Sequence, residues 1–266
     1  MKDLLDLSSI RQKLNTNIIG KEIRLFEDID STNKEAMTLG ASGAKEGTVV
    51  LAEAQTGGKG RLGRTWYSPK GENLYLSIIL RPPVPLSEAQ LITVVAAISV
   101  AETIRKTADI RPGVKWPNDI LINRRKVAGI LTELASGNDM VNYLVVGIGI
   151  NLNMEISSAP EEIREIAGSL KDISGREIDR EGFLAFLLSE FEYYYLIFKA
   201  GERQRIMDIY TGYSATIGNR IRVRSQEGSI EGIACGFNME GGLLLKRDSG
   251  VIDTILTGDI EHIRKD

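Results

Sequence analysis

The sequence predicts an α+β protein, in which a mixed β-sheet packed with helices is followed by a small C-terminal β-barrel-like domain. Over the first 212 residues, apolar β-branched runs such as GTVVLAEAQ alternate with segments of helical periodicity. From Tyr213 the chain changes to short alternating runs separated by Gly, Asn and Asp turns, which are typical of a small barrel or sandwich. We therefore expect a large domain at residues 1–212 and a small domain at residues 213–266.

Each element of the large domain is predicted from its own periodicity and boundary residues. Helices are expected at residues 3–15, 31–43, 87–110, 160–173 and 179–212, and strands at residues 20–30, 47–55, 73–82 and 140–153. The segment DILINRRKVAGILTEL predicts a hairpin with its turn at Asn123 to Arg125. Thr32 and Glu35 have the spacing of a capping box at the start of the second helix. The third helix is apolar on most faces, which predicts that it is buried.

Composition and charge argue against several classes of protein. A net charge of −3 disfavours a general nucleic-acid binder, so any basic site must be local. The single cysteine, Cys235, permits no intramolecular disulfide, and its β-like surroundings predict a small buried side chain. His262 is also alone, which disfavours a structural zinc site. The chain begins with no signal peptide and has no run of about 20 apolar residues, so we expect a cytoplasmic protein without a membrane span.

A glycine-rich loop, QTGGKGRLGRTW at residues 55–66, follows one of the predicted strands directly. Successive N–H groups of such a loop can converge on an anion, and Arg61 and Arg64 add charge-assisted bonds to phosphate or carboxylate. Trp66 can stack on a flat ring or exclude water. The spacing does not match a Walker A sequence, and an isolated stretch of this kind is more often a solvated hairpin loop. A nucleotide phosphate is the natural candidate ligand.

A second constellation, KWPNDILINRRKVAGIL, places polar groups around the predicted hairpin. Lys115, Asn118 and Asp119 lie at the turn before the first strand of this hairpin, and Lys126 follows its tip. A carboxylate and an amide beside a lysine suit a site that holds a nucleotide, Mg²⁺ and developing negative charge. A plain Pro-Asn-Asp turn with surface lysines explains this stretch about equally well. The sequence leaves open whether Asp119 and Lys126 share a face.

Two shorter motifs are ambiguous. DSTN, residues 30–33, is typical of a helix cap, yet such a cap can also present hydroxyl and free N–H groups to a polar ligand. GIGIN, residues 147–151, allows a ligand to lie close to the backbone, although close strand packing explains the glycines as well.

Taken together and in this order, DSTN, GGKGRLGRTW, KWPND, RKVAGIL and GIGIN resemble the biotin–protein ligases, from about residue 20 to the C-terminus. The resemblance implies a catalytic domain that binds biotin and ATP, followed by a small β-barrel. It also implies two reactions, with ATP and Mg²⁺ as cofactors and biotin as substrate. The biotin carboxylate first attacks the α-phosphate of ATP to give biotinyl-5′-AMP and pyrophosphate. A lysine amine of a carrier domain then attacks the acyl carbon and expels AMP.

The same resemblance assigns residues to roles. The catalytic residues are Lys126, Arg61 and Asp119, and Asp119 is also the candidate Mg²⁺ ligand. The candidate biotin-binding residues are Ser31, Thr32, Asn33, Gln55, Gly58, Arg61, Lys126, Gly129, Gly147 and Gly149. The candidate ATP- and adenylate-binding residues are Lys59, Gly60, Arg61, Gly63, Arg64, Trp66, Lys115, Asn118, Asn151 and Arg264. The glycine-rich loop is expected to close over the adenylate and exclude water.

The expected partner is the biotin carboxyl carrier domain of a carboxylase. Homodimers are common in the family, although the sequence identifies no interface. Only 29 residues precede Asp30, so we expect no DNA-binding domain and no sequence-specific DNA binding. The nearest alternative function is a protein ligase for lipoate or another small acid, and a non-catalytic nucleotide-binding regulator is an alternative of a different class.

Overall fold

A seven-stranded mixed β-sheet forms the centre of the large domain in the computed structural model, which describes residues 4–225 and 228–263. In spatial order its strands are β1 (Ile23–Ile29), β2 (Val49–Gln55), β3 (Leu74–Leu80), β7 (Met140–Ile150), β6 (Arg125–Gly137), β5 (Asp119–Ile122) and β4 (Gly113–Lys115). The first two strands pair in parallel and every other neighbouring pair is antiparallel. The sheet is therefore mixed, as the sequence predicts.

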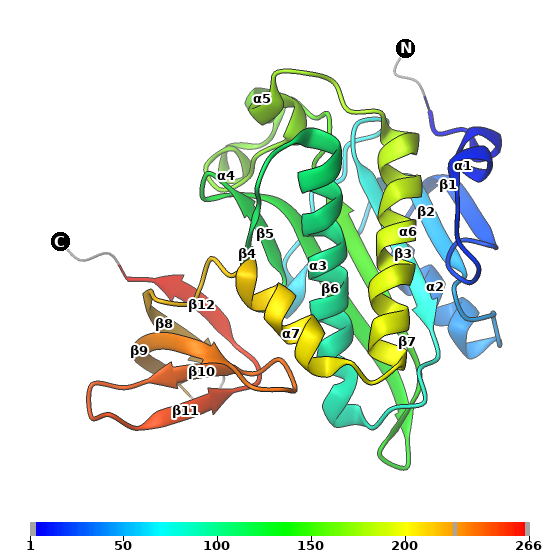
Figure 1. Cartoon of the computed structure of the whole chain (residues 1–266). Coiled ribbons are helices and arrows are strands. Elements are labelled where there is room, and N and C mark those ends of the chain that lie inside the picture. The colour runs from blue at the N-terminus through cyan, green and yellow to red at the C-terminus, as the bar shows by residue number, and fades with distance from the viewer. Residues whose placement is uncertain (1–3, 226–227, 264–266) are drawn as a thin grey trace.

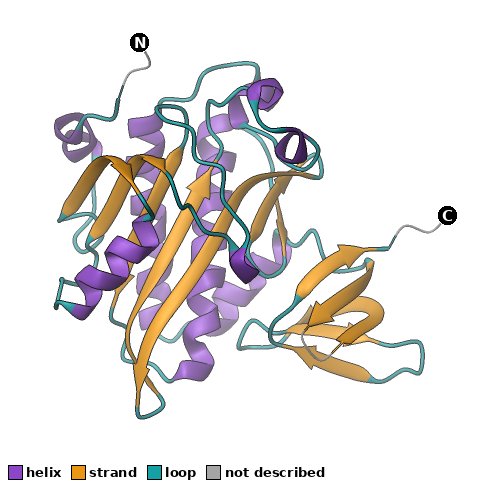
Figure 2. Ribbon diagram, turned by 180° about the vertical axis from the view of Figure 1, so that it is seen from behind, coloured by secondary structure: helices purple, strands orange, loops and turns teal. Residues whose placement is uncertain are grey.

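Helices cover both faces of this sheet. The long helices α3 (Ala89–Ala108) and α6 (Arg180–Lys199) lie side by side on one face, with α7 (Arg203–Gly212) beside them (Figure 1). Helix α2 (Thr32–Ala41) packs on the opposite face, which Figure 2 shows from behind. The remaining helices are α1 (Leu7–Lys13), α4 (Glu161–Arg164) and α5 (Leu170–Ser174), with 3₁₀ turns at Arg61–Gly63, Leu86–Glu88 and Ile156–Ser158.

Helix α3 is the central core helix. The segment Leu86–Ala108 is long and apolar enough to cross a membrane by length and composition, although charged residues interrupt its apolar run. In the fold, however, 83% of its most apolar window is buried inside the protein, against the sheet and α6. The prediction of a buried helix is confirmed, because the same apolar surface is covered by protein.

The C-terminal domain is a five-stranded antiparallel sheet rather than a closed barrel, with the strand order β11-β10-β9-β8-β12. Its strands are β8 (Arg220–Ser225), β9 (Gly228–Phe237), β10 (Leu243–Lys246), β11 (Ile252–Ile255) and β12 (Asp259–His262). The buried indole of Trp116 connects the two sheets, because its Nε1 donates to the carbonyl of Gly241 at 2.9 Å. Backbone hydrogen bonds of Val114 on β4 with Tyr213 and Ala215 also hold the start of the small domain at this edge of the large sheet.

Four local expectations are wrong. The capping box is absent, since Ser31 is the N-cap of α2 without a side-chain cap bond and the Thr32 hydroxyl donates to Gln55 instead. The helix expected at residues 179–212 is divided at Gly201, whose φ of +80° is left-handed. The helix expected at residues 160–173 is likewise two short helices, α4 and α5. Cys235 is exposed rather than buried, because its side chain points away from the core of the small sheet.

The hairpin expected at residues 119–134 is confirmed. Asn123 and Arg124 form its turn, and both have positive φ values, 49° and 66°. This pair of left-handed residues is the geometry of a tight two-residue hairpin loop, and Asn tolerates it well. The turn returns β6 directly along β5 and so carries Lys126 back toward Asp119.

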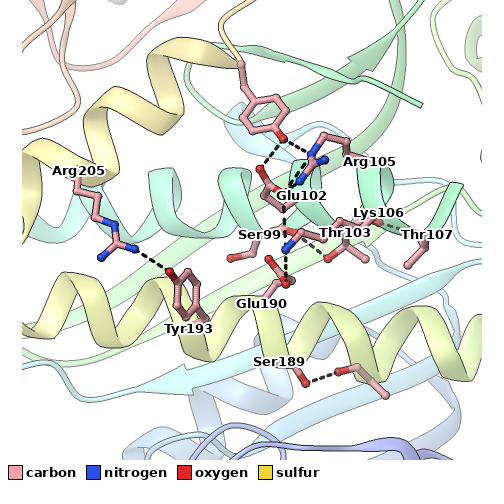
Figure 3. A network of polar contacts seen from close by, with 12 residues as sticks. Ser99, Glu102, Thr103, Arg105, Lys106, Thr107, Ser189, Glu190, Tyr193 and Arg205 are labelled. Atoms are coloured by element: carbon pink, nitrogen blue, oxygen red, sulfur yellow. Dashed lines mark hydrogen bonds and ion pairs between the residues drawn. The ribbon is translucent and has the colours of Figure 1, made fainter. Parts of the chain in front are cut away.

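A polar network connects the helices on the sheet face that α3 and α6 cover (Figure 3). Glu102 on α3 accepts from the hydroxyl of Tyr213 at 2.6 Å and from Nη2 of Arg105 at 2.7 Å. Lys106 on α3 donates to Glu190 on α6 at 2.8 Å. Burial tends to raise the pKa of Glu102, but the hydrogen bonds from Tyr213 and Arg105 outweigh it, so this pKa lies below its ordinary value. The network therefore binds α3 to α6 and to the chain that leads into the small domain.

We expect Glu102→Ala to lower the free energy of unfolding by about 2 kcal/mol at pH 7, because Tyr213 and Arg105 lose a charged acceptor. The folded-state pKa of Glu102 is depressed, so its contribution is present at neutral pH and is lost as the pH falls through that pKa. The difference between the two proteins in urea unfolding should therefore shrink in acid. The exposed Glu240→Ala is the control, and a constant difference from pH 7 to pH 3 would contradict this account.

Candidate active site

Two adjoining pockets lie where the glycine-rich loop crosses the large sheet. The first pocket lies over β3, β6 and β7 and is lined by Ser31, Thr32, Asn33, Gln55, Lys59, Gly60, Arg61, Trp66, Leu76, Asn118, Lys126, Gly129, Ile130, Leu131, Gly147, Ile148 and Gly149. The second pocket extends toward the small domain and is lined by Gly60, Arg61, Arg64, Thr65, Trp66, Tyr67, Lys115, Asn118, Asp119, Leu121, Arg124, Lys126, Asn151, Met154, Ile163, Glu165, Ile166, Ala167 and Asp259. Arg61, Trp66 and Lys126 line both pockets, so they form a shared wall.

The glycine-rich loop folds back on itself to build this wall. The N–H of Gly60 donates to the carbonyl of Arg64 at 2.7 Å, and the N–H of Trp66 donates to the carbonyl of Gly58 at 2.9 Å. Leu62 at the tip has a left-handed φ of 55° and a largely exposed side chain. The loop is thus a closed hairpin with an exposed tip, and its base is fixed beside the pockets.

The indole of Trp66 lies flat against two glycines of the sheet. A Cβ atom at Gly149 would lie 2.5 Å from Cε2 of Trp66, and one at Gly129 would lie 2.9 Å from its Cζ3. Any larger residue at either position would therefore displace the ring. The indole Nε1 is buried and has no hydrogen-bond partner among the described residues. A buried donor without a partner is costly, so this N–H is available to a ligand acceptor.

Lys126 and Asp119 meet at the same wall. Nζ of Lys126 lies 2.6 Å from Oδ1 of Asp119 and 5.2 Å from the centroid of the Trp66 ring. The pairing of β5 with β6 is irregular here, since Ile120 pairs with Ala128 but Leu121 pairs with Lys126. The extra residue is a β-bulge, which changes the direction of neighbouring side chains. The two groups that the sequence left unplaced are therefore brought together.

Arg61 connects this wall to the small domain. Its guanidinium donates to Oδ1 of Asn118 and to the carbonyl of Gly258, both at 3.3 Å, and to the hydroxyl of Thr257. Arg64 forms an ion pair with Asp259. Burial lowers the pKa of Arg61 from its ordinary value, and the group remains a cation at neutral pH. The two arginines thus attach the loop to the start of β12.

The far end of the first pocket is polar. Oε1 of Gln55 accepts from the backbone N–H of Thr32 at 2.9 Å and from its hydroxyl at 3.1 Å. The hydroxyl of Ser77 lies 2.8 Å from that of Thr32 and donates to Oδ1 of Asn33 at 2.6 Å. The amide of Asn33 donates in turn to Glu133 at 2.7 Å. A ligand at this end therefore meets both donors and acceptors in fixed orientations.

Most of the residues that the sequence assigned to biotin line the first pocket. They are Ser31, Thr32, Asn33, Gln55, Arg61, Lys126, Gly129, Gly147 and Gly149. Gly147 is packed against Asn33, because a Cβ there would lie 2.1 Å from Oδ1 of that side chain. Gly58 does not line either pocket; a Cβ there would lie 2.7 Å from the carbonyl oxygen of Trp66, so this glycine permits the loop to close.

The residues assigned to the nucleotide are distributed less evenly. Gly60, Arg61, Arg64, Trp66, Lys115, Asn118 and Asn151 line the second pocket, together with the candidate metal ligand Asp119. Lys59 lines the first pocket instead, because it precedes the turn of the loop. Gly63 lines neither pocket and has a left-handed φ of 74° with open space around it. Arg264 lies outside the described residues.

Several residues of the site escaped the sequence interpretation. Ser77 on β3 and Glu133 on β6 line neither pocket, but they hydrogen-bond to the lining residues Thr32 and Asn33. A polar residue inside the apolar run of β3 is the signal that could have indicated Ser77. Much of the apolar wall of the second pocket comes from Met154, Ile163, Ile166 and Ala167. Nothing in the sequence indicated this contribution, because residues 154–167 carry no motif.

The residues at the wall fit a metal ion that arrives with a nucleotide. The described residues contain no group of three His, Cys, Asp or Glu side chains that could bind a metal ion by themselves. Mg²⁺ commonly takes one or two carboxylates and completes its coordination with substrate phosphates and water. Asp119 offers one such carboxylate beside the second pocket.

Comparison with known proteins agrees with this geometry. Residues 25–151 match the biotin/lipoate A/B protein ligase family, and residues 216–263 match the biotin protein ligase C-terminal domain. The bifunctional ligase/repressor BirA of Bacillus subtilis is 39% identical over 257 residues, which cover 97% of this chain and 79% of the relative. The biotin–[acetyl-CoA-carboxylase] ligase of Mycobacterium tuberculosis is 32% identical over 267 residues, which cover 98% of this chain and 96% of the relative.

A solved structure extends the similarity to three dimensions. The biotin protein ligase from Aquifex aeolicus in complex with biotin and ATP has a TM-score of 0.80 and 31% identity, with 92% of this chain and all of that chain covered. The α+β fold with a separate small C-terminal sheet is thus shared as well as the sequence. The chain belongs to the biotin protein ligase family.

Proposed function

We propose that this chain is an ATP-dependent ligase that activates biotin as biotinyl-5′-AMP and transfers it to a lysine of a biotin carboxyl carrier domain. The observation that carries the proposal is the wall shared by the two pockets, where Lys126, Arg61 and Trp66 meet. A small acid in the first pocket and a nucleotide in the second pocket would have their reacting groups at this wall. We assign the reaction to residues 1–212 and a supporting role to residues 213–266.

Activation needs positive charge at the wall. As the biotin carboxylate attacks the α-phosphorus, negative charge builds up on the phosphoryl oxygens. The ammonium of Lys126 and the guanidinium of Arg61 neutralise this charge, and both are held in place before substrate binds by Asp119 and Asn118. Fixed charges of this kind lose little energy to reorganisation during the reaction. Asp119 also offers a carboxylate to the Mg²⁺ that accompanies ATP.

The polar end of the first pocket favours biotin over lipoate. The ureido ring of biotin has N–H donors and a carbonyl acceptor, which match the Thr32 hydroxyl and the Gln55 amide. The dithiolane ring of lipoate has neither, so it would gain no hydrogen bond from these groups. A site built for hydrogen bonds rejects a ligand that lacks them more strongly than an apolar site rejects an extra atom.

Transfer requires that water stay away from the adenylate. Trp66 and the base of the glycine-rich loop lie across the shared wall, where the acyl phosphate would form. The side chain of Leu62 at the tip is exposed, and the neighbouring Arg61 contacts the small domain. A carrier lysine then attacks the acyl carbon, and AMP leaves with the electrons of the broken bond.

Three further properties are also proposals: the cellular location, the oligomeric state and the absence of DNA binding. We propose that the ligase acts in the cytoplasm, where ATP and carboxylases occur, and that it forms homodimers; cell fractionation and sedimentation test the two statements. We also propose that it does not bind DNA, since its net charge is −3, although the Bacillus relatives are named repressors. A mobility shift with biotin-operon DNA at physiological salt would contradict this.

We expect Lys126→Ala to slow adenylate formation by about 10²–10³-fold, because one fixed cation is removed from the developing charge. Pyrophosphate release with biotin and ATP measures the rate, and circular dichroism reports whether the fold is intact. The control is Lys21→Ala, which changes an exposed lysine two residues before β1. Turnover close to that of the unaltered protein would remove Lys126 from the mechanism.

We expect Thr32→Val to weaken biotin binding by about tenfold or more, because the substitution keeps the shape but removes a hydroxyl that the ligand would meet. Isothermal titration with biotin measures this, and ATP–pyrophosphate exchange with biotin and with lipoate establishes the substrate. Thr38→Val, at an exposed position of the same helix, is the control. Exchange with lipoate alone would overturn the assignment of biotin.

A further inference from the structure

A basic cavity lies at the junction of the two domains, beside the second pocket. Its charged lining comes from Arg111 before β4, Lys115 on β4, Arg124 at the hairpin turn and His262 on β12. We call it the junction pocket. No Asp or Glu lines it within the described part of the chain. Lys115 and Arg124 also line the second pocket, so the two cavities adjoin.

The cations of the junction pocket lack acidic partners. Among residues 4–225 and 228–263, no ion pair involves Arg111, Lys115 or Arg124, and Arg111 donates only to the carbonyl of Gly212 at 3.4 Å. The neighbouring strand β8 differs, since Arg220 pairs with Asp248 at 2.6 Å and Arg222 is paired as well. Like charges gathered without a counter-charge repel one another, and an anion would relieve this repulsion.

His262 supplies an independent observation. Its side chain is half-buried, and its Nε2 is buried without a hydrogen-bond partner among the described residues. Burial, together with the charges of Lys115 and Arg124, holds the pKa of this imidazole below its ordinary value. Buried polar atoms are nearly always paired, so an unpaired ring nitrogen at a basic cavity points to a ligand with oxygen atoms.

The position of the cavity identifies the kind of anion. The junction pocket adjoins the second pocket but shares no residue with the first, so it lies on the side of the site away from the carboxylic acid. Guanidinium groups match phosphate oxygens in a bidentate manner. During activation, the bond from the carboxylate oxygen to the α-phosphorus forms while the bond from that phosphorus to the bridging oxygen breaks. Pyrophosphate takes the electron pair and leaves.

We propose that the junction pocket binds this pyrophosphate leaving group, with Arg111, Lys115, Arg124 and His262 as its ligands. The inference rests on the proposed function, since that reaction is the source of the anion. The pocket stabilises the charge on the leaving group and gives it an exit that does not pass the acyl adenylate. Product pyrophosphate therefore remains near the adenylate until it dissociates, and it can reverse the first step.

The chain contains a single histidine, so every imidazole NMR signal of the protein comes from His262. We would label the full-length protein with ¹⁵N-histidine and titrate it with inorganic pyrophosphate, following the imidazole signals by NMR. The expected result is a saturable shift, with a dissociation constant that increases about tenfold or more in Arg111→Ala. Arg24→Ala, which removes an exposed arginine from β1 at the opposite edge of the sheet, should bind like the unaltered protein.

A second measurement covers the case in which Arg111→Ala is poorly folded. Inhibition of adenylate formation by added pyrophosphate should weaken by a similar factor in Arg124→Ala. Imidazole signals that do not respond to pyrophosphate, or an equal response in Arg111→Ala, would overturn the proposal.

The same protein sample, supplied with biotin and ATP, tests the proposed function separately. Adenylate formation without any response of His262 to pyrophosphate refutes the junction pocket alone. Pyrophosphate binding without adenylate formation refutes the ligase reaction, and with it the identity of the anion as a reaction product.

Discussion

The site depends on where the ammonium group of Lys126 is held. A lysine side chain has many rotamers, and a free one would spread its charge over a wide volume. The 2.6 Å ion pair with Asp119 and the nearby ring of Trp66 confine it to the wall between the two pockets. Both side chains are partly buried, and the cost of removing two charges from water offsets much of their attraction. The ion pair therefore matters for the position of the ammonium group more than for stability. The bulge in the β5–β6 pairing is the backbone feature that makes the contact possible.

Space at this wall is supplied by glycines rather than by polar groups. Gly129 and Gly149 allow the Trp66 ring to lie directly on the sheet, and Gly147 does the same for Asn33. These three positions come from two neighbouring strands, so a flat recess runs across β6 and β7. The recess, the ring and the amide together define a slot with an apolar middle and a polar end. A slot of this shape fits a small acid that carries a polar ring.

Much of this could be predicted from the sequence, because periodicity and short motifs are local signals. The motifs KWPND and RKVAGIL indicated the chemistry of Asp119 and Lys126, and the turn residues indicated the hairpin. Their contact could not be predicted, since a one-residue bulge decides which face each side chain takes.

Other features depend on residues far apart in the chain. The Thr32 hydroxyl donates to Gln55 instead of capping α2, because tertiary contacts override a local capping pattern. The contact of Arg61 with Thr257 joins segments almost 200 residues apart. Cys235 shows the limit of strand periodicity, since a small sheet with one covered face leaves alternate residues exposed. The grouping of Arg111 with His262 has the same origin, because it needs both domains in place.

We propose that Lys126 acts at the junction of an acid pocket and a nucleotide pocket. A crystal structure with a non-hydrolysable analogue of biotinyl-5′-AMP would test this role. We expect Nζ of Lys126 to lie about 3 Å from oxygens of the acyl-phosphate linkage, with the ureido ring at Thr32 and the adenosine in the second pocket. An analogue bound elsewhere, or a Lys126 side chain that remains on Asp119 and points away from the linkage, would contradict it.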